Sequence, residues 1–116
     1  MLPLSERARI EIYLPDLPLE PYQNLLTVFQ QELTYALGGC SVLRSVEGAY
    51  LSLEGAHISD RVSILYTDAP FAFAENFDVL SKYADELRDA AFRSLDEEAV
   101  LVVTMNVYHA VRPLYG

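Results

Sequence analysis

The feature that most constrains the fold is an amphipathic helix pattern over residues 22–37, with β-type patterns on both sides of it. Apolar residues recur at three- and four-residue spacing, and glutamines and a glutamate take the opposite face. These apolar positions are Tyr22, Leu25, Leu26, Phe29, Leu33 and Leu37. Pro21 suits the first turn of a helix, and Gly38-Gly39 suits its end, where a left-handed residue is common. We therefore predict a helix that buries one face and ends at Gly38.

The segments around this helix have the composition of β-strands. Residues 9–14 alternate polar and apolar side chains, and the last segment of the chain is the richest in β-branched residues. Gly48 interrupts the second segment and predicts a bulge, while residues 54–57 have the composition of a hairpin tip. We predict four strands, over residues 9–14, 41–53, 61–67 and 99 to about 111.

A second amphipathic pattern predicts a helix from about residue 75 to residue 95. Its inner face is expected to carry Phe77, Leu80, Ala84, Leu87 and Ala91. The resulting order is β-α-β-β-α-β, which is typical of the ferredoxin-like sandwich. We therefore predict an α+β fold in which a four-stranded antiparallel sheet carries two helices on one face. Residues 1–116 are expected to form a single domain.

Charge and cysteine content exclude several classes of function. The formal net charge is −9 and the isoelectric point is about 4.5. Such a chain repels phosphate, which disfavours binding to nucleic acid or to an anionic membrane. The single cysteine forms no internal disulfide and builds no multi-cysteine metal cluster, and we predict neither a metal site nor a cofactor. The sequence shows no signal peptide and no membrane-length apolar run, so we expect a cytoplasmic protein.

One face of the predicted sheet is left without helices. If Ile10 and Ile12 face the helices, Arg9, Glu11 and Tyr13 face away from them. Alternation along the strands suggests the other rows: Val62, Ile64 and Tyr66 are taken to face inward, and Leu101, Val103, Met105 and Val107 are expected to form the inner row of the last strand. The outward rows are then Arg61, Ser63 and Leu65 on one strand, and Val102, Thr104, Asn106 and Tyr108 on another. This outer face is less polar than a fully solvated sheet, which predicts a homodimer through this face or through an edge strand. A face that is simply solvated is the alternative.

Three residues have side chains that carry chemistry. Cys40 follows the two glycines, and it is expected to be a packing residue rather than a nucleophile because no base is placed beside it. His57 lies at the predicted hairpin tip and is expected to be exposed. His109 lies near the end of the last strand, where a general base, a ligand contact and a partly buried histidine are the alternatives.

Three short motifs stand out along the chain: Gly38-Gly39-Cys40-Ser41, Glu47-Gly48-Ala49-Tyr50 and Asp60-Arg61-Val62. Together they resemble a family of small uncharacterised bacterial and phage proteins. The resemblance implies a bacterial protein with a ferredoxin-like fold. The family has no established activity to transfer, so the resemblance implies no catalytic residue.

Two functional hypotheses follow. The first is a non-enzymatic binding or regulatory module that forms a homo-oligomer through its open sheet face and takes a small molecule or a protein as partner. The second is a cofactor-free enzyme of the dimeric α/β-barrel type, similar to certain monooxygenases, with a pocket between sheet and helices. The first is favoured because no nucleophile–base pair stands out. The candidate ligand-binding or interface residues are Tyr13, Tyr50, Arg61, Tyr66, Asn106, Tyr108 and His109.

Overall fold

The computed structural model describes residues 4–95 and 100–110 of the chain. The strands are β1 (Leu4–Pro15), β2 (Ser41–Leu51), β3 (His57–Asp68) and β4 (Leu101–Ala110). The helices are α1 (Glu20–Leu37), a short 3₁₀ turn η1 (Ala74–Asn76) and α2 (Phe77–Ser94). This order confirms the predicted β-α-β-β-α-β arrangement.

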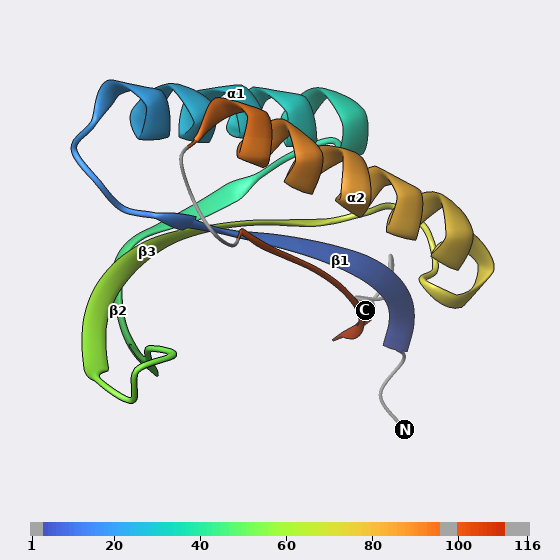
Figure 1. The fold of residues 1–116 in the computed structure, drawn as a ribbon. Coiled ribbons are helices and arrows are strands. Elements are labelled where there is room, and N and C mark those ends of the chain that lie inside the picture. Colours follow the sequence, from blue (N-terminus) through green and yellow to red (C-terminus); the bar gives the residue numbers. More distant parts are fainter. Residues whose placement is uncertain (1–3, 96–99, 111–116) are drawn as a thin grey trace.

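The four strands form one antiparallel sheet in the order β2-β3-β1-β4. Both helices lie on the same face of the sheet (Figure 1). The sheet bends away from the helices, so that the β2–β3 hairpin and the start of β1 both curve toward the helix-free side (Figure 1). The helix-free side, which we call the outer face, is therefore concave.

The core lies between the helices and the sheet. It is built around the inner row of β1, the buried faces of α1 and α2, and single residues of β3 and the following loop. The largest of these side chains are fully enclosed: Ile10, Ile12, Leu14, Leu33, Leu65 and Leu80. Burial of such aliphatic side chains supplies the main driving force for folding.

The termini of α1 agree with the sequence prediction. Pro21 occupies the first turn of the helix, where its missing N–H has no helical partner to lose. Gly38 follows the last turn with a φ of 95°, and its backbone N–H donates a hydrogen bond to the Thr34 carbonyl at 2.9 Å. The left-handed conformation favours glycine because a Cβ is strained there.

The predicted orientation of β3 is wrong. Leu65 lies opposite Ile12 in the register, and Tyr66 lies opposite Glu11. Directly paired residues share a face, so Leu65 faces the helices with Ser63, while Tyr66 faces outward with Ile64. The physical reason is that pairing with β1 decides the orientation, whereas alternation along one strand gives two rows without saying which of them faces the helices.

The predicted orientation of β4 is wrong for the same reason. Val102 lies opposite Ile12 and Thr104 lies opposite Ile10, so this row faces the helix side. Val103 pairs with Glu11 and therefore belongs to the outer face. The outer row of β4 is Leu101, Val103, Met105 and Val107, the row that was expected to be buried.

Smaller differences concern single residues and boundaries. The irregularity in β2 lies between Leu43 and Val46, whereas Gly48 pairs regularly with Asp60, so the bulge predicted at Gly48 is wrong. Phe77 is half exposed rather than part of the inner face, because it begins α2 beyond the edge of the core. Strands β1 and β3 are longer than predicted. The predicted limits of the last strand, at 99 and 111, lie outside the described residues.

Candidate interface on the outer face of the sheet

The outer face carries a set of apolar side chains that the described part of the chain leaves without a covering layer. Two of them, Leu43 and Leu101, are 50% and 55% exposed. We call this set the outer belt, and it comprises Tyr13, Leu43, Val62, Ile64, Leu101, Val103, Met105 and Val107. An antiparallel sheet with one solvated face normally presents polar residues there. The outer belt therefore has the character of a surface that contacts another molecule.

A charged cluster lies at one end of the same face and joins three strands. Arg9 donates from Nε to Asp68 Oδ1 at 2.6 Å and from Nη2 to Oδ2 at 3.0 Å. His109 Nε2 lies 3.1 Å from Asp68 Oδ2. The Arg9 guanidinium holds the pKa of the Asp68 carboxyl below its usual range, and His109 adds to this effect. The carboxylate is thus ionised and fixed in position by β1 and β4.

Two tyrosines extend the polar contacts of this face. The Arg9 guanidinium lies over the ring of Tyr66, 4.8 Å from the ring centre, which is a cation–π arrangement. Tyr13 donates its hydroxyl to Glu11 Oε1 at 2.8 Å, and this bond to a carboxylate raises the tyrosine pKa. The central strand therefore carries charge between the apolar rows of β3 and β4.

Three of the predicted site residues lie on the outer face, and two of them, Tyr66 and His109, belong to the cluster around Arg9 and Asp68. Tyr13 lies there as expected, and Tyr66 joins it because of the reversed orientation of β3. His109 contacts the carboxylate that follows Tyr66 by two positions. Tyr66 and His109 therefore lie in one cluster, which is on the outer face and not in a pocket between the sheet and the helices.

The remaining predicted site residues lie elsewhere. Asn106 and Tyr108 pair with Ala8 and Glu6, which places them on the helix side of β4, where both are exposed. Their outward placement on the helix-free face is thus wrong, for the register reason given above. Tyr50 pairs with Ile58 near the end of the hairpin.

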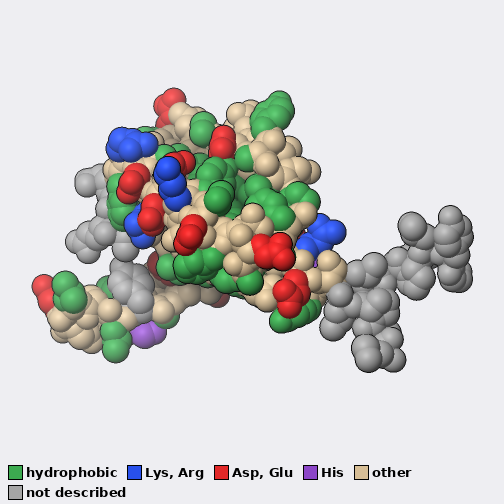
Figure 2. Space-filling view, turned by 90° about the vertical axis from the view of Figure 1, so that its right-hand side faces the viewer, with side chains coloured by type: hydrophobic (Ala, Val, Ile, Leu, Met, Phe, Trp, Pro, Cys, Tyr) green, Lys and Arg blue, Asp and Glu red, His purple; other side chains and the backbone are tan. Residues whose placement is uncertain are grey.

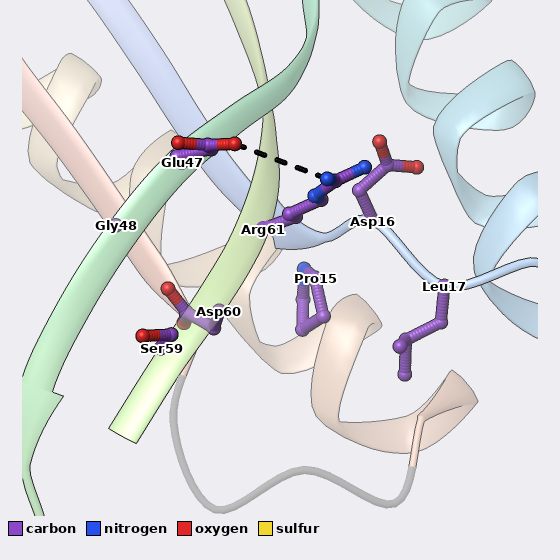
Figure 3. Close-up of a pocket in the computed structure, with 8 residues that line it drawn as sticks. All are labelled: Pro15, Asp16, Leu17, Glu47, Gly48, Ser59, Asp60 and Arg61. Atoms are coloured by element: carbon purple, nitrogen blue, oxygen red, sulfur yellow. Dashed lines mark ion pairs between the residues drawn. The ribbon is translucent and has the colours of Figure 1, made fainter. Parts of the chain in front are cut away.

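Arg61 lies on the wall of a cleft of about 700 Å³ between the β2–β3 hairpin and the β1–α1 loop (Figure 3). Its Nη2 atom is 3.8 Å from Glu47 Oε1, and both side chains are largely exposed. Asp16 and Asp60 also line the cleft. A loose, solvated ion pair of this kind contributes little to stability. The described residues bring together no group of three or more His, Cys, Asp or Glu side chains arranged to hold a metal ion.

Cys40 and the two glycines line a smaller cleft of about 330 Å³, which also reaches Tyr66 and Asp68. The Cys40 side chain is partly buried and packs against the core, and burial raises the pKa of its thiol. A raised pKa lowers the fraction of reactive thiolate. This environment agrees with a packing role for Cys40.

The helical side carries the charges expected of a solvated surface. Asp85 pairs with Arg88 at 2.9 Å, and both are about half exposed. Figure 2 shows acidic and basic side chains interspersed over the helical layer above the sheet. His57 begins β3 beside the hairpin tip and is exposed, as predicted. No described helix has the length and hydropathy needed to cross a membrane.

Taken together, the sheet order and the one-sided helical layer define a ferredoxin-like α+β protein, and two solved structures share this fold. The first is a divalent cation tolerance protein (CutA1) from Thermus thermophilus, at 13% identity over 87% of this chain and 82% of that chain, with a TM-score of 0.52. The second is CutA1 from Oryza sativa, at 13% identity over 88% of this chain and 80% of that chain, with a TM-score of 0.50.

At 13% identity these neighbours show a common fold only. No family model and no curated protein match the chain. The resemblance to small bacterial and phage proteins is thus supported at the level of the ferredoxin-like fold, and its narrower form stays a prediction.

Proposed function

We propose that this chain is a small, non-enzymatic binding or regulatory module that forms a homo-oligomer, a dimer in the simplest case, through its outer face. The observation that carries the proposal is the outer belt, which is apolar, concave and without a covering layer among the described residues. Burying such a surface against a second copy removes it from water at a gain of about 25 cal/mol per Å² of apolar area.

The charge distribution supports the same proposal. The chain carries a net charge of −9, so two copies repel each other over most orientations. The outer row of the central strand carries Arg7, Arg9 and Glu11, and Asp68 of β3 pairs with Arg9, so two positive and two negative charges offset one another here. Association through this face therefore brings together surfaces with little net charge.

Light scattering at several protein concentrations tests the proposal. We expect a mass of about twice the 13.0 kDa of one chain, and a Val103→Lys variant is expected to return the mass of one chain. The matched control is Val79→Lys, because Val79 is 67% exposed on α2, away from the outer face. A single-chain mass for the unmodified protein at every concentration would refute self-association, and a Val103→Lys variant that stays oligomeric would exclude the outer face.

A second candidate function is the cofactor-free enzyme of the dimeric α/β-barrel type. The observation in its favour is that the Asp68 carboxylate orients His109 at 3.1 Å and lines the 330 Å³ cleft together with Tyr66. A histidine held by a carboxylate is a common general base. Oxygen uptake with a panel of electron-rich phenols, for the unmodified protein and for His109→Gln, tests this candidate. Equal uptake by both proteins, or none by either, would reject it.

A further inference from the structure

Strand β4 forms one edge of the sheet, and no described strand pairs with its free side. Its ten residues, Leu101–Ala110, include no Lys, Arg, Asp, Glu, Pro or Gly. Proteins usually protect a free edge with charged side chains, proline, a bulge or a very short strand. By these criteria β4 is an unprotected edge, with backbone groups available to pair with another strand.

The opposite edge of the sheet is protected. Strand β2 carries Arg44 and Glu47, and its pairing with β3 shifts between Leu43 and Val46. Ser45 within this irregular segment has a φ of 55°, which interrupts the regular strand. Because a bulge and charges blunt β2, the contrast singles out β4 as the edge that accepts a partner.

The partner that fits this edge is a second copy of the same strand. In antiparallel self-pairing about a two-fold axis, the strand lies against itself in reverse, so a charged residue near the axis would face a like charge. β4 has no such residue, although the chain as a whole carries a charge of −9. Two copies can therefore pair along this edge without placing like charges of the strand opposite each other.

We propose that two copies pair β4 with β4 in antiparallel orientation and join their sheets into one continuous sheet. A two-fold axis perpendicular to the sheet makes the two β4 strands antiparallel and keeps both helical layers on the same side. Each sheet is concave on its outer face (Figure 1), so the two outer belts lie side by side on the same concave side of the joined sheet. The apolar row of β4, which includes Val103 and Met105, then lies at the junction. The inference rests on the proposed self-association and specifies its geometry.

Disulfide crosslinking between single-cysteine variants tests this geometry. Cys40→Ser removes the native thiol, and cysteine is then introduced by Thr104→Cys, Asn106→Cys or Tyr108→Cys. These three positions lie on the helix side of β4, so the outer belt is unchanged, and none of them is buried. Across an antiparallel pair the Cα atoms lie within disulfide range only for directly opposed residues.

In antiparallel self-pairing, the numbers of two opposed residues always add to the same value. We therefore expect the covalent dimer to be the major product for variant pairs that share one sum, and to be absent for the others. If Asn106→Cys links to its own copy, for example, Thr104→Cys must link to Tyr108→Cys. Ala49→Cys is the control, because this position is exposed on the protected edge β2 and is expected not to link to any β4 variant.

The outcomes separate the two proposals. Crosslinks that obey one sum support β4–β4 pairing. Crosslinks with no constant sum, links from Ala49→Cys to β4, or no crosslink in a protein that light scattering shows to be dimeric would overturn β4–β4 pairing and leave self-association intact. A mass of one chain at every concentration would overturn both.

Discussion

The ion pair between Arg9 and Asp68 offers the most direct test of how the outer face is held together. Asp68→Asn keeps the shape of the side chain and removes its charge. The carboxylate accepts two hydrogen bonds from Arg9, at 2.6 and 3.0 Å, and lies 3.1 Å from His109 Nε2. Hydrogen bonds to charged groups contribute about 1.5–3 kcal/mol each. The Asp68 side chain is 20% exposed, which reduces this contribution by solvent screening.

We therefore expect Asp68→Asn to lower the free energy of unfolding by about 2 kcal/mol at pH 7, because the amide keeps one acceptor oxygen. Unfolding entropy of about 2.1 cal/mol/K per residue makes this a fall of about 8 °C in Tm for a chain of this length. The measurement is urea or thermal unfolding at one fixed protein concentration, since self-association also stabilises the fold. The control is Asp85→Asn, which breaks a half-exposed pair with Arg88 and is expected to cost about 0.5 kcal/mol or less.

The same pair predicts how stability depends on pH. The folded-state pKa of Asp68 lies below its unfolded value, which is about 3.9. Its contribution is therefore fully present above the unfolded pKa and is lost as the pH falls through the folded pKa. The difference between the unmodified protein and Asp68→Asn should be constant above about pH 5 and shrink toward zero in stronger acid. A difference below about 0.5 kcal/mol at pH 7, or one that persists in strong acid, would refute the assignment.

Three further predictions concern single residues of the fold. Ser63→Ala should leave stability unchanged or raise it by up to about 1 kcal/mol in urea unfolding, because the buried hydroxyl has no partner among the described residues. Gly38→Ala should cost about 1 kcal/mol, because φ is 95° there, whereas Gly39→Ala, with open space around its Cβ, should be nearly neutral. Cys40 should react with iodoacetamide at pH 7.5 more slowly than free cysteine, because burial raises its pKa; equal rates would contradict this.

Local signals in the sequence were sufficient to predict the secondary structure and the fold. The helix ending at Gly38 and the order of strands follow from periodicity and from turn residues, which act over a few positions. The cluster on the outer face is different, because Arg9 and Asp68 are 59 positions apart. Only the pairing of β1 with β3 brings them together, and a single sequence does not specify that register. The only signal for this cluster in the sequence was the presence of the charged residues Arg9 and Asp68 in two segments that are otherwise rich in apolar residues.

The errors in strand orientation have a physical meaning. In β1 one row is charged and the other aliphatic, and the orientation was predicted correctly, because Arg9 and Glu11 have a clear preference for the outer face. In β4 both rows contain apolar residues, so periodicity gave no basis for choosing, and the more apolar row lies outside. In a sheet with one permanently solvated face, the strand residues that point to the solvent are normally polar. The apolar outer row of β4 therefore explains the wrong prediction, and it also supports an interface on the outer face and along the free edge of β4.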